Sequence, residues 1–196
     1  MGPVANHRRP GGARLARRDS LRAPMRRRPE QLATGEWAVL ALLAEAPTHG
    51  FAIARALAPA GDVGRVWAMR RPLVYRTLDV LSERELVRAA GTEPSESGPP
   101  RTVLDVTRDG RERVEAWLLA PVEHVRDARA DLMLKLLFLD RAGRAPAPLL
   151  RAQRERFAVI AAELEKAEEA GFARTLALWR LENTRAAIRF VDGLLS

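Results

Sequence analysis

The sequence predicts a mainly α-helical fold with one small β-hairpin. Apolar residues recur at intervals of three or four over most of the chain after residue 31, which is the spacing of amphipathic helices. Only two short runs, 86–93 and 102–106, have the pattern of strands, and the turn-rich segment 94–100 separates them. Hydrophobic residues make up 47% of the 196 residues, which is ordinary for a folded domain with a real core.

Three short helices are predicted ahead of the hairpin. The first spans 34–46, with Thr34 as its N-terminal cap. The second begins after Thr48, another candidate cap, and the loop between these helices is so short that they must pack together. The third spans 72–84, and its inner stripe is Val74, Leu78 and Leu81. Three helices followed by a hairpin are the parts of a winged helix-turn-helix domain.

Long helices alone are predicted after the hairpin. Thr107 caps the first of them, and residues 127–139 are apolar almost all round, which predicts a central place in a core. A helix over 147–170, ended by Gly171, and a last helix over 173–195 carry stripes of coiled-coil character. The stripe of the last helix consists of Leu176, Trp179, Asn183, Ala186, Phe190 and Leu194.

The last helix also predicts self-association. Trp179 and Phe190 are hard to bury inside so small a helical subdomain, and pairing with a second copy would cover them. We therefore expect a winged helix-turn-helix DNA-binding domain over 31–121 and a helical dimerisation and effector domain over 122–196.

The net charge of +8 is concentrated at the N-terminus. Residues 1–30 hold nine arginines against Asp19 and Glu30, so they carry seven of the eight net charges. This stretch has too little apolar surface to fold alone, and it predicts a disordered basic arm. The preference for arginine over lysine suits phosphate binding, but the codon bias of a GC-rich genome explains it equally well.

Composition argues against several classes of function. The chain has no cysteine, which fits a reducing cytosol, and no apolar run long enough to span a membrane, so we expect a cytoplasmic protein. No glycine-rich phosphate loop, metal-spaced histidine cluster or nucleophile–base pairing is recognisable, and we expect no catalytic residue, metal or cofactor. His49 stands far from His7 and His124, which favours a packing or capping role over metal binding.

Several short motifs, in this order and spacing, resemble the PadR family of transcriptional regulators between about Trp37 and Leu118. The family's Pro-x-His-Gly-Tyr segment corresponds to Pro-Thr-His-Gly-Phe at 47–51, and its Leu-Tyr-Pro-x-Leu-x-x-Leu pattern to Val-Tyr-Arg-Thr-Leu-Asp-Val-Leu at 74–81. The end of the returning wing strand, Leu-Thr-x-x-Gly in the family, corresponds to Val-Thr-Arg-Asp-Gly at 106–110.

The chain departs from the family pattern at three places. Arg70-Arg71-Pro72 replaces the usual Ser-x-Gly, and Glu85 stands where glycine is usual before the wing. The wing reads Gly-Pro-Pro-Arg-Thr-Val-Leu over 98–104, so it lacks two basic residues and the aromatic residue of the family's wing, and Glu93 and Glu96 lie nearby.

The resemblance implies a cytoplasmic, homodimeric, ligand-responsive repressor that binds double-stranded DNA, often with a small aromatic effector. In this chain the third helix would enter the major groove, with Arg76 at a base edge and Arg71 and Tyr75 on phosphates. The full set of expected DNA contacts is Arg70, Arg71, Tyr75, Arg76 and Arg101. The candidates for an effector pocket at the dimer interface are Trp117, Trp179 and Phe190, for which ordinary core or interface packing is the alternative.

Two other classes of function remain open. A helical-dimer interaction module whose winged helix no longer binds DNA would fit the weakly basic wing. An enzyme is the third class, although no motif indicates one. Salt-dependent binding to DNA discriminates between the DNA-binding repressor and the interaction module, because phosphate contacts must release counterions.

Overall fold

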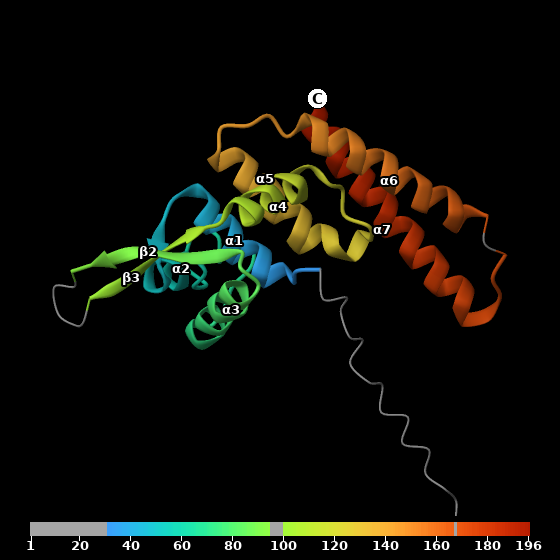
Figure 1. Ribbon diagram of the computed structural model, residues 1–196. Helices are drawn as coiled ribbons and strands as arrows, with labels where there is room; N and C mark the ends of the chain where they lie inside the picture. The colour runs from blue at the N-terminus through green and yellow to red at the C-terminus, as the bar shows by residue number, and fades with distance from the viewer. Residues whose placement is uncertain (1–30, 95–99, 167) are drawn as a thin grey trace, which may run out of the picture. The chain divides into compact units, whose positions relative to one another are not determined.

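A computed structural model describes residues 31–94, 100–166 and 168–196, and it confirms the mainly α fold with a small sheet. The predicted basic arm, residues 1–30, and most of the predicted loop 94–100 lie outside these residues. Three helices come first: α1 (Thr34–Glu45), α2 (Gly50–Ala56) and α3 (Arg71–Glu83). The antiparallel sheet has the order β1-β3-β2 and consists of β1 (Thr48–His49), β2 (Val87–Glu93) and β3 (Arg101–Val106) (Figure 1).

All described secondary-structure elements after β3 are helical. It forms α4 (Arg108–Leu119), the short 3₁₀ turn η1 (Val125–Asp127), the π-helical turn η2 (Ala128–Leu132), α5 (Met133–Arg141), α6 (Ala147–Glu165) and α7 (Gly171–Leu195) (Figure 1). The last two helices pack along each other. The predicted single helix over 127–139 is thus three successive helical segments.

One of the three predicted helix caps is confirmed. The Thr107 hydroxyl oxygen accepts the N–H of Gly110 at 3.1 Å and caps α4. Thr34 does not cap α1, because the helix already includes it and Glu36 instead accepts the N–H of Ala33. Thr48 does not cap α2, because it pairs with Leu104 as part of a third strand, and Nδ1 of His49 accepts the N–H of Ala52 at 3.1 Å.

The prediction that Gly171 ends the helix over 147–170 is wrong. α6 ends at Glu165, and Gly171 is the first residue of α7, with a φ of 58° that suits glycine. Gly171 has the left-handed backbone conformation for which glycine is suited. That conformation lies at the start of α7, however, and not at the end of α6 as predicted.

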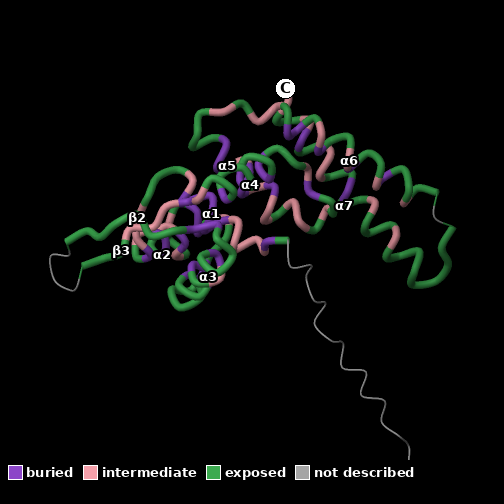
Figure 2. Tube along the Cα trace, viewed as in Figure 1, coloured by how far each residue is buried: buried purple, intermediate pink, exposed green. Residues whose placement is uncertain are grey.

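A single apolar core runs from the winged helix into the C-terminal helices. Its centre is α1, where every residue from Ala38 to Leu43 is buried (Figure 2). Residues of α4, α5 and α6 belong to the same cluster, among them Leu118, Phe138 and Phe157. Residues Leu32–Ser196 form one compact unit.

The segment that joins α4 to η1 is fixed by a buried side chain. Gln153 of α6 is fully buried, and its amide accepts the N–H of Val122 at 2.7 Å and donates to the Val122 carbonyl at 3.1 Å. Both polar atoms of the amide are therefore satisfied within the core. This pairing explains the one polar residue in an otherwise apolar stripe of α6.

Candidate nucleic-acid interface and ligand pocket

The packing of α3 decides which of its side chains face solvent. Val74, Leu78 and Leu81 are buried, as predicted, and they hold the helix against the core. The opposite face carries Arg71, Tyr75 and Arg76, all exposed, with Arg70 as the residue that precedes the helix. The four predicted DNA contacts of this region thus lie together on one exposed helix and its N-terminal cap.

The start of α2 lies directly against α3. A Cβ atom at Gly50 would lie 2.9 Å from Cε1 of Tyr75 and 3.1 Å from Cδ1 of Leu78. Real Cβ atoms do not approach so closely, and only glycine allows this contact. The close approach fixes the Tyr75 ring, which is 38% exposed, at the edge of α2.

A cluster of cations and aromatic rings joins α3 to the wing. The guanidinium carbon of Arg71 lies 5.2 Å from the centre of the Phe51 ring and 5.7 Å from that of Tyr75. The guanidinium carbon of Arg101, on β3, lies 5.2 Å from the same Phe51 ring. Phe51, which is 41% exposed, thus contacts two arginines from separate elements, Arg71 of α3 and Arg101 of β3.

This cluster borders a hollow of about 580 Å³ between α3 and the wing. Its lining includes His49, Phe51, Arg71, Tyr75 and Arg101, and also the carboxylate-bearing Asp79. Sequence analysis missed Phe51 and assigned His49 only packing or capping. The available signal was their place in the Pro-Thr-His-Gly-Phe motif beside the predicted third helix.

The arginines of this surface differ from most others in their pairing. Arg70, Arg71, Arg76 and Arg101 make no ion pair with any carboxylate in the described part of the chain. Arg88 on the neighbouring strand, by contrast, contacts Asp105 at 2.7 Å. The unpaired guanidinium groups leave a local positive charge that is open to an anion.

The three predicted pocket aromatics do not converge. Trp117 is buried and stacks on Trp37 at 5.2 Å with an angle of 9° between the rings. The Phe138 ring packs edge-on against Trp117, with 6.4 Å between the ring centres. Trp179 and Phe190 are instead exposed on α7. The structure therefore places Trp117 in the core of this chain and leaves the other two on its surface.

The Trp117 environment contains a buried lysine. Nζ of Lys135 lies 5.4 Å from the centre of the Trp117 ring and donates a hydrogen bond to the Ala120 carbonyl. Burial lowers the pKa of Lys135 from 10.5 to about 8, and the nearby carboxylate of Asp131 opposes this effect. A lysine with only 3% of its surface exposed is thus part of the junction between α4 and α5.

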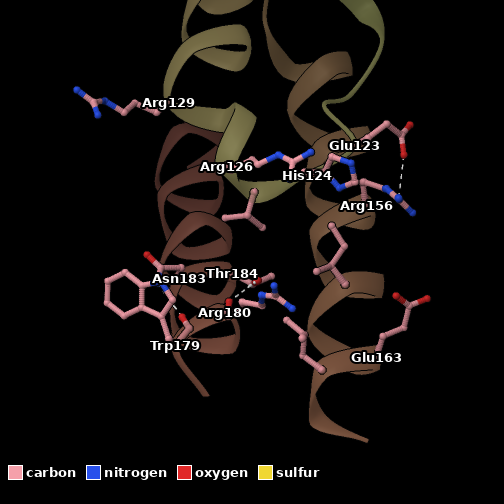
Figure 3. A pocket seen from close by; sticks show the side chains of 13 residues that line it. Glu123, His124, Arg126, Arg129, Arg156, Glu163, Trp179, Arg180, Asn183 and Thr184 are labelled. Atoms are coloured by element: carbon pink, nitrogen blue, oxygen red, sulfur yellow. Dashed lines mark hydrogen bonds and ion pairs between the residues drawn. The ribbon is translucent and has the colours of Figure 1, made fainter. Parts of the chain in front are cut away.

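A second hollow, of about 690 Å³, lies between η1, α6 and α7. Arg126, Arg156 and Arg180 line it, and Arg156 pairs with Glu123 at 2.8 Å. Figure 3 shows Arg126 and Arg180 in the space between the two long helices, whereas Trp179 lies at the outer edge of α7. Of the predicted pocket residues only Trp179 lines this hollow, which is basic with an aromatic rim.

The described residues hold neither a metal-ligand cluster nor a membrane-spanning helix. Within residues 31–94, 100–166 and 168–196, no three histidine or acidic side chains come together in a group that could hold a metal ion. None of the helices that the structure describes has the length and apolar character needed to cross a membrane.

The winged helix and the C-terminal helices can be compared with solved structures. Bacillus subtilis PadR in complex with operator DNA is 18% identical over 82% of this chain and 97% of that chain, with a TM-score of 0.42. Bacillus subtilis PadR in complex with p-coumaric acid is 16% identical over 83% and 97%, with a TM-score of 0.39. The smu.1604c protein from Streptococcus mutans UA159 is 15% identical over 82% and 98%, also with a TM-score of 0.39.

Sequence comparison identifies the family. No curated protein sequence matches the chain. Residues 39–116, however, match the family described as the transcriptional regulator PadR-like family. The matched residues begin within α1, end within α4 and include α2, α3 with its exposed arginines, and both strands of the hairpin. The winged-helix segment, residues 39–116, therefore belongs to the PadR-like family of transcriptional regulators.

Proposed function

We propose that this regulator is a homodimeric repressor that binds double-stranded DNA through its winged helix and responds to a small aromatic ligand. One observation carries the proposal: Arg70, Arg71 and Arg76 all lie exposed on the solvent side of α3 and its cap, without ion pairs to described carboxylates. Such a face attracts the phosphates of DNA, and a helix of this kind fits the major groove.

The orientation of α3 suggests a role for each contact. Tyr75 and Arg76 are successive residues, so they project about 100° apart and reach different features of the duplex. Arg71 and Tyr75, on the side of α2 and the wing, suit phosphates, which position the protein. Arg76 suits a base edge, most often guanine, because a guanidinium can donate two hydrogen bonds to guanine O6 and N7.

The C-terminal helices supply the dimer in this proposal. All six residues of the predicted α7 stripe, from Leu176 to Leu194, are exposed, whereas Thr184 and Val191 on another face are buried. A second copy is the simplest cover for an apolar stripe along so long a helix, and it would present two winged helices to a two-fold symmetric operator. Residues 31–121 would then bind DNA, and residues 122–196 would dimerise and hold the ligand.

The hollow between η1, α6 and α7 is the proposed ligand site. Trp179 offers a flat apolar surface at the rim of the hollow, and Arg126 and Arg180 offer cations in the space between the two long helices (Figure 3). An aromatic compound with an acidic group matches both features. The hollow includes Glu123 and His124, which directly follow the residue that Gln153 holds, so its occupancy has a short route to α4.

The replacement Arg76→Ala tests the DNA-binding part of the proposal. Wild type should bind the promoter region of its own gene with an affinity that falls as salt rises. The variant should fold as wild type and lose about 1–3 kcal/mol on that DNA, and less on a scrambled duplex. Arg151→Ala, an exposed arginine of α6, serves as the control. If wild type shows no salt-dependent binding to this DNA, the interaction-module alternative is favoured instead.

A further inference from the structure

We propose that His49, Phe51, Arg71 and Arg101 form one phosphate-binding clamp between the recognition helix α3 and the wing. The inference rests on the proposed DNA binding and adds two residues, His49 as a donor and Phe51 as a positioning residue. It also assigns the wing's Arg101 to the same backbone phosphate as Arg71.

The tautomer of His49 follows from its hydrogen bond to the backbone. Its Nδ1 accepts the backbone N–H of Ala52 at 3.1 Å, so Nδ1 carries no proton. In a neutral imidazole the single proton then resides on Nε2, which makes Nε2 a donor. His49 lines the hollow between α3 and the wing.

A second donor, Arg101, lies next to Nε2 of His49. The Nη1 atom of Arg101 lies 3.4 Å from Nε2 of His49. A guanidinium has donors only, so the two groups cannot satisfy each other. An oxygen that accepts from both would satisfy them together, and an anionic oxygen would also offset the charge of Arg101.

The side chains of Arg71 and Arg101 contact the same aromatic ring. Arg71 and Arg101 each lie 5.2 Å from the centre of the Phe51 ring, which keeps two like charges on a common apolar support. Cation–π contacts hold guanidinium groups while leaving their N–H donors free for another partner. Neither arginine is paired with a described carboxylate, and an anion between them would bring the missing negative charge.

A DNA phosphate is the occupant that this placement favours. The clamp joins the exposed face of α3 to Arg101, the first residue of the wing strand β3, and a DNA strand would pass there if α3 lay in the major groove. A backbone phosphate carries the oxygens that the three donors require and no sequence information. The clamp would thus fix the register of α3 and leave sequence reading to other residues.

The test measures the binding of the full chain to a fluorescent duplex of random sequence over a series of KCl concentrations. Arg101→Gln should weaken binding about tenfold and lower the salt slope by about 1. His49→Asn keeps an oxygen that can cap α2 but loses the Nε2 donor, so it should weaken binding a few-fold without changing the slope. Because both donors hold the same phosphate, the double variant should bind little worse than Arg101→Gln alone.

Phe51 needs a test that separates positioning from folding. Phe51→Leu should weaken binding at an unchanged melting temperature, and Phe51→Tyr, which keeps the aromatic face, should restore it. Arg151→Gln removes an exposed charge on α6, away from the clamp, and should change affinity little. In the histidine side-chain NMR spectrum, His49 should have its proton on Nε2 in the free protein, and the signal should shift on adding DNA.

The outcomes separate this inference from the proposed function. If wild type binds the duplex while Arg101→Gln and His49→Asn bind equally well, the clamp is wrong and DNA binding stands. Purely additive effects of the two replacements, or a His49 signal that DNA leaves unchanged, would also overturn it. If wild type shows no salt-dependent binding to any duplex, the proposed function fails and the clamp fails with it.

Discussion

The first and the last helix of this regulator differ in how much of their surface the same chain buries. α1 has 12 residues, of which six in succession, Ala38–Leu43, are buried by the rest of the same chain. α7 has 25 residues, of which only Thr184 and Val191 are buried (Figure 2). Both helices are rich in apolar residues, so composition alone does not separate them.

The difference shows which part of the molecule is complete in one chain. α1 contacts α3, α4 and β3, and these elements surround it. α7 packs on α6 along one face, while Trp179, 67% exposed, and Phe190, 44% exposed, lie on a face that the described chain does not cover. An exposed apolar stripe of this length is typical of an interface. The core of the winged helix is thus completed by residues of one chain, whereas in our proposal a second copy covers the exposed face of α7.

Leu40→Ala should produce the largest effect, because Leu40 is at the centre of the self-contained core. Its side chain is fully buried in α1. The truncation should lower the free energy of unfolding by about 2–5 kcal/mol through lost burial and a cavity. Urea unfolding followed by circular dichroism measures this loss. A loss below 1 kcal/mol would show that the core around α1 can collapse to fill the space, and would weaken the contrast with α7.

Lys135→Met probes the junction between the winged helix and the C-terminal helices. The folded protein releases the Lys135 proton at a pKa of about 8, whereas the unfolded chain keeps it up to about 10.5. Wild-type stability should therefore rise as pH increases from 8 to 10.5, by at most about 3 kcal/mol, and fall back as pH decreases through 8.

The methionine variant should lose this pH dependence, because it has no proton to release. Chemical unfolding at several pH values between 8 and 10.5 measures the slope. Lys166→Met, at an exposed lysine, should keep the wild-type slope. Equal slopes in wild type and Lys135→Met would contradict the lowered pKa.

Phe190→Ala acts on the incomplete face. The replacement should weaken the dimer about tenfold to a hundredfold, which corresponds to about 1.4–2.7 kcal/mol, and leave the monomer folded. Sedimentation equilibrium gives the dissociation constant. Arg189→Ala, the neighbouring exposed residue of α7, is the matched control and should change it little. If Phe190→Ala dissociates no more readily than this control, the interface is elsewhere.

Glu85→Gly should give the smallest effect, and it should stabilise the protein. Glu85 has a φ of 57°, a left-handed conformation that costs a residue with a Cβ atom about 1 kcal/mol. Glycine should recover part of that cost, giving a higher melting temperature. Arg84→Gly, whose φ is −86°, is the control and should not stabilise. A melting temperature unchanged or lowered by Glu85→Gly would show that the Glu85 side chain contributes more than its strain costs.

Sequence reasoning worked best where a pattern has one local cause. Thr107 was predicted to cap α4 from its place before Asp109, and the structure confirms the contact. It failed where a distant partner changed the local outcome. Thr48 had the right chemistry for a cap, but β3 pairs with it and leaves the cap to His49. Trp117 had the right chemistry for a ligand pocket, but Trp37 and Phe138 enclose it.

The sequence by itself determined the order of the helices, the hairpin, the inner and outer faces of α3 and the family. Periodicity and capping depend on neighbours along the chain, and a sequence displays these directly. Only the tertiary structure decided that Arg71 and Arg101 share the Phe51 ring and that Gln153 holds Val122. Arg101 and Phe51 are 30 or more positions apart in the sequence, and so are Gln153 and Val122. No local sequence pattern specifies which distant side chain will be the partner.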